Sequence, residues 1–281
     1  MKSGSLRPRA GAATLRALMS WTVSRGPRRI VCLTEEPTEI LYQLGEGDRI
    51  VGISAYTVRP PEARRDKPVV SAFVGGSVRK ICALAPDLVI GFSDIQADLA
   101  RQLIAANLPV LIFNQRSLQE ILDVILDLGR LVDRRDAAEA LVAGYVQRLE
   151  QAAARAAQRA WRPRVYFEEW DEPMISAIRW VSELIAIAGG RDIFEARSHG
   201  KLARERFVSA EEVLAQNPEV VLASWCGKPF ERPAFENRPG FAALEAVRRG
   251  RVHEVPAELI LQPGPACLTD GLDFLLDVLK E

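Results

Sequence analysis

The chain of 281 residues repeats the same order of parts in its two halves, and this repeat most limits what it can fold into. Early in each half, a short apolar run is followed by a glutamate pair, Glu35-Glu36 and Glu168-Glu169. Later in each half, a helix pattern, a proline and a buried-strand pattern follow one another, with the prolines at Pro86 and Pro218. The glutamate pairs lie 133 residues apart and the prolines 132. Alternating helix and strand signals are typical of α/β folds, so we predict two Rossmann-like α/β lobes of related topology.

Local patterns predict the elements at the start of each half. Short apolar runs at 28–33 and 164–167 predict buried strands, and helices ended by glycine are expected at 38–44 and 175–188. Ser209 and Glu212 have the spacing of a capping box, in which the hydroxyl and the carboxylate each pair with a helix N–H group.

A long helix pattern separates the halves. Residues 136–160 are rich in Ala, Glu, Arg and Gln, with apolar residues every four positions from Leu141, and Pro163 follows them. A helix of this length would be a rod of roughly 37 Å. We therefore expect lobes at 28–133 and 161–281, joined by a stiff backbone helix at 134–160. The alternative is a surface helix that packs on one lobe only.

The first 27 residues are basic and contain no acidic residue. Their apolar stretch is broken by Arg16, whereas a secretory signal needs about 7–15 uninterrupted apolar residues. We expect residues 1–27 to form a disordered tail, with a degenerate export signal as the alternative.

Composition excludes several classes of function. Lys plus Arg and Asp plus Glu both number 37, so no basic field is available to hold a nucleic acid. No window of 18 residues is apolar enough to span a membrane. The four cysteines are far apart and only two histidines occur, which argues against a metal site in the protein or a disulfide framework. The sequence contains no phosphate-binding loop or nucleophile motif, so we expect no enzyme activity and no intrinsic cofactor.

Five segments, in order, resemble the helical-backbone substrate-binding proteins of ABC-type importers for iron-siderophores, haem and cobalamin: RIVCLTEEPTEILYQLGEGDRIVGIS (29–54), LAPDLVI (84–90), WVSELIAIAGGRDIF (180–194), VSAEEVLAQNPEVVL (208–222) and LEAVRRGRVHEV (244–255). Ser54-Ala55-Tyr56 and residues 60–63 are most similar to the cobalamin-binding branch. The resemblance implies two lobes with a corrinoid ligand between them, little hinge motion, a monomer, a periplasmic location and a permease partner. Haem or a ferric siderophore is the alternative ligand.

Ligands of α/β proteins bind beyond the carboxyl ends of the strands, and aromatic faces suit a broad planar molecule. Cys226 follows a predicted strand and precedes Lys228, so a thiolate with a lowered pKa could bind the ligand's cobalt or iron. Several acidic residues lie near the predicted cleft, and because carboxylates repel an anion they favour a neutral or cationic ligand. We expect ligand contacts from ten residues: Glu35, Tyr56, Phe73, Phe92, Glu168, Trp170, Trp180, Trp225, Cys226 and Gln262.

The resemblance also implies a docking carboxylate on each lobe, at the start of the helices after Ser77 and Ser209. Glu211 matches the second position, whereas the first is occupied by Arg79. A cation in place of a carboxylate reverses the interaction with a basic permease pocket. The alternative to delivery to a permease is therefore a cytoplasmic corrinoid carrier or sensor.

Overall fold

A parallel sheet forms the centre of the first lobe. The computed structural model describes residues 26–72 and 74–280, so most of the predicted tail at 1–27, and Phe73, lie outside the described residues. The strand order is β3-β2-β1-β4-β5, and every neighbouring pair is parallel. The strands are β1 (Ile30–Cys32), β2 (Ile50–Ser54), β3 (Val69–Ser71), β4 (Leu88–Phe92) and β5 (Val110–Phe113).

The second lobe is built on a mixed sheet of order β10-β9-β6-β7, with β8 paired to β6. Only β7 runs antiparallel, as the second strand of a hairpin with β6. The strands are β6 (Arg164–Asp171), β7 (Met174–Ser176), β8 (Arg191–Asp192), β9 (Val220–Ala223) and β10 (Val252–Glu254). Helices follow most strands in both lobes, which confirms the prediction of two α/β lobes.

The first lobe carries α2 (Glu35–Gln43), α3 (Pro61–Asp66), α4 (Val78–Ala83), α5 (Ala97–Ala105) and α6 (Leu118–Leu131). The second carries α8 (Arg179–Ile187), α9 (Glu195–Ser198), α10 (Ala210–Gln216), α11 (Arg232–Glu236), α12 (Glu245–Arg248), α13 (Ala257–Ile260) and α14 (Leu272–Val278). The 3-10 helix η3 (Ala203–Arg206) precedes α10, and the π-helix η5 (Cys267–Gly271) precedes α14. The capping box of Ser209 and Glu212 at α10 is confirmed.

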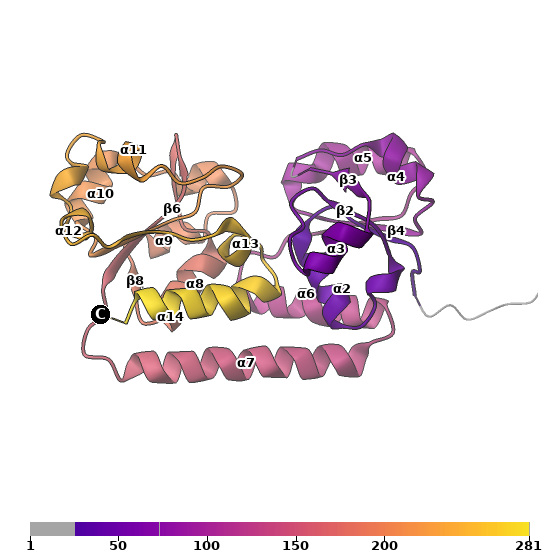
Figure 1. Ribbon diagram of the computed structural model, residues 1–281, viewed down its shortest axis with the longest axis horizontal. Helices are drawn as coiled ribbons and strands as arrows, with labels where there is room; N and C mark the ends of the chain where they lie inside the picture. Colours follow the sequence, from indigo (N-terminus) through magenta and orange to yellow (C-terminus); the bar gives the residue numbers. More distant parts are fainter. Residues whose placement is uncertain (1–25, 73, 281) are drawn as a thin grey trace, which may run out of the picture.

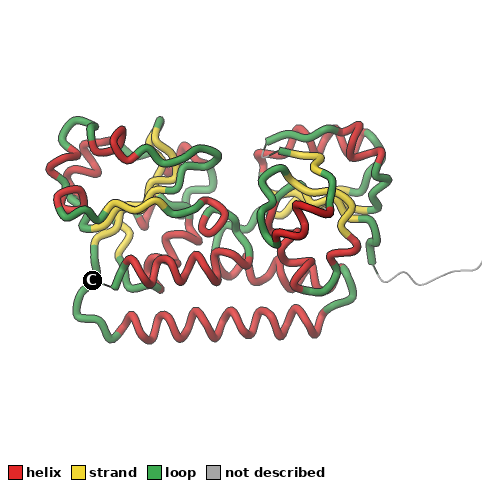
Figure 2. The backbone as a smooth tube through the Cα atoms, viewed as in Figure 1, coloured by secondary structure: helices red, strands yellow, loops and turns green. Residues whose placement is uncertain are grey.

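The helix α7 (Arg135–Ala157) runs beneath both lobes (Figure 1), and the tube in Figure 2 shows it as one uninterrupted helix. It contacts α6 on one side and α8 on the other, so the alternative of a helix that packs on one lobe only is wrong. A single buried cluster includes Ile90 of the first sheet, Tyr145 and Leu149 of α7, and Val165 of the second sheet. Because the lobes share this core, rotating one against the other would break apolar packing.

Two predicted boundaries were wrong. The helix α2 begins at Glu35 instead of residue 38, so the first glutamate pair lies in its first turn. The strand β6 continues to Asp171 and pairs with β7, and α8 begins only at Arg179. The reason is the hairpin, which keeps the second glutamate pair in extended conformation. No helix in the described ranges has the length and apolar character to cross a bilayer.

Candidate ligand-binding cleft

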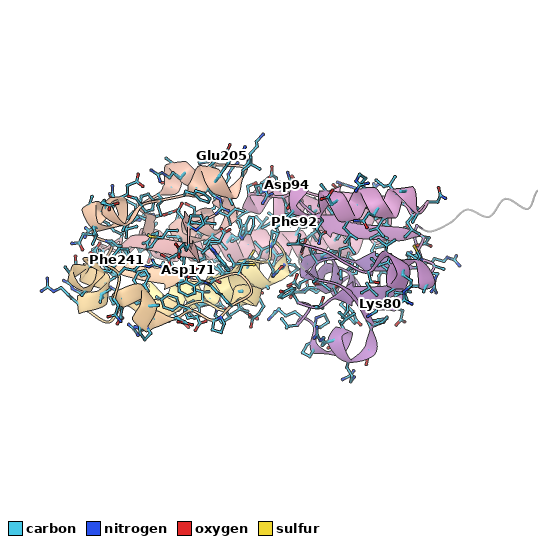
Figure 3. The ribbon with its side chains drawn as sticks, turned by 90° about the horizontal axis from the view of Figure 1, so that it is seen from above. Lys80, Phe92, Asp94, Asp171, Glu205 and Phe241 are labelled. Atoms are coloured by element: carbon cyan, nitrogen blue, oxygen red, sulfur yellow. The ribbon has the colours of Figure 1, made fainter. Side chains whose placement is uncertain are left out.

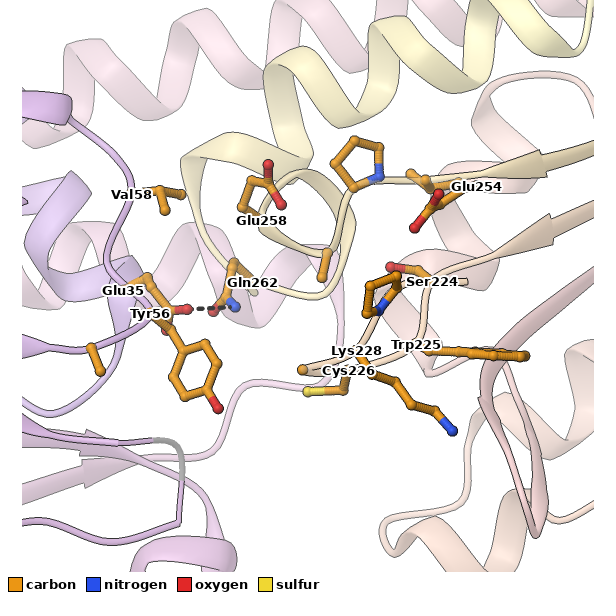
Figure 4. A pocket seen from close by; sticks show the side chains of 16 residues that line it. Glu35, Tyr56, Val58, Ser224, Trp225, Cys226, Lys228, Glu254, Glu258 and Gln262 are labelled. Carbon is orange, nitrogen blue, oxygen red and sulfur yellow. Dashed lines mark hydrogen bonds between the residues drawn. The ribbon is translucent and has the colours of Figure 1, made fainter. Parts of the chain in front are cut away.

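A cleft of about 620 Å³ lies between the two lobes (Figure 4). From the first lobe, Glu35 follows β1 and Tyr56 follows β2; from the second, the loop 224–229 follows β9. These segments meet because the carboxyl ends of parallel strands lie at one edge of each sheet. The hydroxyl oxygen of Tyr56 lies 3.8 Å from the position that a Cβ atom would take on Gly227 of the opposite lobe. The aromatic ring therefore reaches across the cleft.

A smaller chamber of about 230 Å³ adjoins this cleft, and Cys226 and Gln262 line both. Its first-lobe wall includes Phe92 at the end of β4 and Arg116 after β5, and its second-lobe wall includes Trp180 at the start of α8. Viewed from above in Figure 3, Phe92 and Asp94 lie near the junction of the lobes. The Trp180 indole N–H donates to the carbonyl of Ile260 at 2.9 Å, which fixes the ring in the chamber wall.

The structure brings together seven of the ten predicted ligand contacts. Five line the larger cleft: Glu35, Tyr56, Trp225, Cys226 and Gln262. Phe92 and Trp180 line the smaller chamber alone. The role of all seven as ligand contacts stays a prediction. The Gln262 amide donates to the Glu35 carboxyl at 2.9 Å, linking the lobes across the cleft floor (Figure 4). Trp170 lines neither space; its ring lies 4.4 Å from the Lys228 ammonium.

The interpretation of Glu168 as a ligand contact was wrong. Its carboxylate is fully buried in the second lobe and accepts two hydrogen bonds from the Arg238 guanidinium, at 2.6 and 2.9 Å. It also accepts from the Trp225 indole N–H and the Tyr166 hydroxyl, both at 3.0 Å. Successive side chains of β6 point to opposite faces, so Glu168 points into the lobe whereas Glu169 lines the smaller chamber. Glu168 therefore orients Trp225 in the cleft wall instead of meeting the ligand.

The expectation of a reactive thiolate at Cys226 was also wrong. Burial and the nearby carboxyls of Glu169 and Glu35 raise the pKa of the Cys226 thiol to about 11. Lys228 does not lower it, because its ammonium donates to Asp171 at 2.7 Å. At neutral pH Cys226 is therefore a neutral thiol that projects into the cleft.

The acidic character of the cleft is weaker than the sequence suggested. Burial raises the pKa of Glu35 to about 7, and burial together with Glu35 raises that of Glu36 to about 8. Each of these carboxyls has one buried oxygen without a hydrogen-bond partner in the described part of the chain. The argument for a neutral or cationic ligand therefore fails, because at least Glu36 is mostly protonated at neutral pH.

Sequence reasoning missed two arginines of the smaller chamber. Arg116 follows β5, so the rule that ligands bind at carboxyl ends of strands could have found it. Arg206 belongs to η3, a 3-10 helix with no clear signal in the sequence, and forms a two-point pair with Glu169. Within the described residues, no cluster of three or more histidine, cysteine or acidic side chains could hold a metal ion.

The predicted docking residues lie far from the cleft floor. Arg79 is exposed on α4, and Glu211 is exposed in the first turn of α10. Both helices lie in the upper part of their lobes in Figure 1, on the side away from α7. The two helices that carry these residues thus lie on the same side of the molecule.

Comparison with known proteins agrees with this architecture. The chain is 26% identical over 265 residues to YvrC of Bacillus subtilis, whose name describes an ABC transporter substrate-binding lipoprotein; the match covers 91% of this chain and 81% of that protein. It is 29% identical over 261 residues to the vitamin B12-binding protein of Vibrio cholerae, covering 90% and 89% of the two chains. The solved structure of the periplasmic haem-binding protein RhuT from Roseiflexus has a TM-score of 0.73 at 26% identity, covering 90% of this chain and 99% of that one. The sequence profile of periplasmic binding proteins matches residues 30–259, and the chain belongs to this family.

Proposed function

We propose that this protein captures a corrinoid, or a related metal complex of similar size, as the substrate-binding component of an ABC-type importer. Haem is the second candidate, favoured by the likeness to RhuT. The protein carries out no reaction on its ligand in this proposal. It binds the intact complex and releases it to a permease.

The observation that carries the proposal is a cleft between two lobes with an aromatic side chain on each wall. Tyr56 stands on one side, 44% exposed. Trp225 lines the other and is 4% exposed, because Phe230 packs edge-on against it at 5.0 Å between ring centroids and the Lys228 ammonium lies 4.7 Å from its ring centroid. Aromatic faces bury a large area of a flat ligand at little cost in side-chain entropy. A volume of about 620 Å³ falls in the range of sites for compact organic ligands.

The shared core supports capture without wide hinge motion. Residues of both sheets and of α7 belong to one buried cluster, and Gln262 bonds to Glu35 at the base of the cleft. A cleft held nearly in its binding geometry loses little conformational entropy when the ligand enters.

The relatives support a location outside the cytoplasm. YvrC is named a lipoprotein and RhuT a periplasmic protein, and we infer that this chain also acts outside the cytoplasm. We further infer that its permease meets Glu211 with a basic group and Arg79 with an acidic or neutral one, because like charges at a contact repel.

Calorimetric titration with cyanocobalamin, haem and a ferric hydroxamate siderophore tests the proposal. We expect saturable one-site binding of at least one macrocycle, weakened in the variant Tyr56→Ala and unchanged in Ile104→Ala, which alters an exposed apolar residue on α5. Failure of the native protein to bind any of the three ligands would overturn it.

A further inference from the structure

Three basic side chains line the smaller chamber, Arg116 from the first lobe, and Arg206 and Lys201 from the second. Three acids also line it: Glu36, Asp94 and Glu169. Glu169 is already held by Arg206, and Asp94 lies 3.4 Å from Arg116 with its side chain 66% exposed.

Three polar atoms of these lining side chains are buried without a hydrogen-bond partner among the described residues. They are the Nε atoms of Arg116 and Arg206 and one carboxyl oxygen of Glu36. Arg206 is 3% exposed, and its two terminal nitrogens are committed to Glu169 and to the carbonyl of Ser176. Buried polar groups in native proteins normally have partners, so three unpaired atoms in one chamber indicate that a polar group belongs there.

Glu36 does not cancel this positive charge at neutral pH. Burial raises its pKa to about 8, and one oxygen already accepts from the Thr34 hydroxyl at 2.9 Å. The protonated carboxyl is therefore a hydrogen-bond donor in a chamber that Arg116 and Arg206 also line. Burial lowers the pKa of Arg116, the nearby Asp94 opposes this shift, and repulsion from Arg206 adds to it. An anion between the two arginines would relieve that repulsion.

We propose that the smaller chamber is a carboxylate-binding subsite that spans the two lobes, and that the ligand therefore bears at least one free carboxylate side arm. The arm would accept hydrogen bonds from Arg116 and Glu36 on the first lobe and meet the positive charge of Arg206 and Lys201 on the second.

The inference rests on the proposed function, because the ligand's ring must occupy the larger cleft for its arm to reach the chamber. Cys226 and Gln262 line both spaces, so the two adjoin at these residues. A volume of about 230 Å³ suits a side arm and is too small for a macrocycle. The expected class is thus a metal macrocycle with an acidic arm, in preference to one whose arms are all amides or esters.

Two matched pairs of ligands test this inference: haem against its dimethyl ester, and cyanocobalamin against its monocarboxylic acid. Tryptophan fluorescence and calorimetry would report the dissociation constants, since Trp180 and Trp225 line the two spaces. We expect the acid of at least one pair to bind about tenfold or more tightly than its neutral partner, the effect of one charged hydrogen bond. The variant Arg116→Gln should reduce that ratio below threefold.

The control variant is Arg101→Gln, which removes an arginine that is 74% exposed on α5. It should keep the full acid preference. Binding of acid and neutral forms with equal affinity, or a preference that survives Arg116→Gln, would overturn the carboxylate subsite and leave the proposed function standing. Absence of binding by all four ligands would overturn both.

Discussion

Arg59 of the first lobe and Asp270 of the second form an ion pair across the lobe boundary, with 2.7 Å between Nη1 and Oδ2. The same guanidinium donates through Nε to Glu39 of α2 at 3.0 Å, and Glu39 in turn accepts from the backbone N–H of Ala266 at 3.1 Å. Arg59 thus joins α2, the loop after β2 and the π-helix η5. This arrangement fixes the lobes on the side of the cleft nearest α14.

The two partners of Arg59 differ in burial, so breaking the two ion pairs should lower the free energy of unfolding by different amounts. The side chain of Glu39 is 8% exposed and that of Asp270 is 52% exposed. We expect Arg59→Met to lower the free energy of unfolding by about 2–3 kcal/mol, because it leaves a buried carboxylate without its cation. Asp270→Asn should cost less than about 1 kcal/mol, since exposed pairs contribute little. Urea unfolding of both variants measures the difference, and equal losses would contradict it.

The raised pKa of Glu36 makes stability depend on pH. The folded protein holds this proton up to about pH 8, whereas the unfolded chain releases it near 4.5. The stabilisation is therefore complete below pH 4.5 and is lost as the pH rises through 8. The pKa of Glu35 is also raised, to about 7, so Glu35 likewise makes the stability fall as the pH rises. This part of the pH dependence remains when Glu36 is replaced.

The variant Glu36→Gln replaces the titrating carboxyl with an amide, which does not titrate. Relative to the native protein, we expect it to gain stability between pH 5 and pH 9, on the order of 4 kcal/mol for a shift of this size. Urea unfolding at both pH values tests the change. Glu139→Gln, which alters an exposed carboxyl on α7, should show no such gain. A variant that keeps the native pH slope would show that Glu36 is charged in the folded protein.

Hydrophobic periodicity and the repeated order of parts were enough to predict the two lobes and the long helix, since both depend on local patterns. They could not separate the strand β6 from the loop after it. Glu168 looks like a loop residue in sequence, yet it is buried because Arg238, 70 residues away, supplies its counter-charge. Such a pairing is set by tertiary packing and leaves no signal near Glu168 itself. Arg206 could not be predicted for the same reason, because its position depends on contacts with Glu169 and the carbonyl of Ser176.

Removing only one partner of the buried pair Glu168 and Arg238 should destabilise the folded protein strongly. We expect Arg238→Met to lower the free energy of unfolding by about 3–5 kcal/mol, because Glu168 would remain fully buried without a cation. It should also disturb the Trp225 indole, which donates to the same carboxylate. Urea unfolding and near-ultraviolet circular dichroism would report the two effects. Arg249→Met is the control, since Arg249 is 60% exposed and pairs with Glu245 at the surface.

Cys226 should react slowly with thiol reagents. With its pKa raised to about 11, its thiolate is about 100-fold scarcer at pH 8 than that of a free cysteine. In a Cys82→Ser background, which removes the other partly exposed cysteine, modification by a disulfide reagent should accelerate on unfolding by at least that factor. Rapid modification of the folded protein would mean that Lys228 activates the thiol after all.

Substitutions of Tyr56 should change the affinity for the ligand without changing the stability of the folded protein. Its ring is 44% exposed and contributes little to either core, yet its hydroxyl lies close to Gly227 across the cleft. Truncation to alanine should therefore leave the urea midpoint unchanged and weaken binding of the macrocycle by about 10–100-fold, the effect expected for an aromatic side chain at the centre of a contact. The variant Tyr56→Phe keeps the ring and should bind within about threefold of the native protein if stacking dominates over the hydroxyl. Calorimetry on the three proteins distinguishes these outcomes. If alanine binds as tightly as tyrosine, the ligand does not contact this wall and must lie deeper, against Trp225 and Trp180.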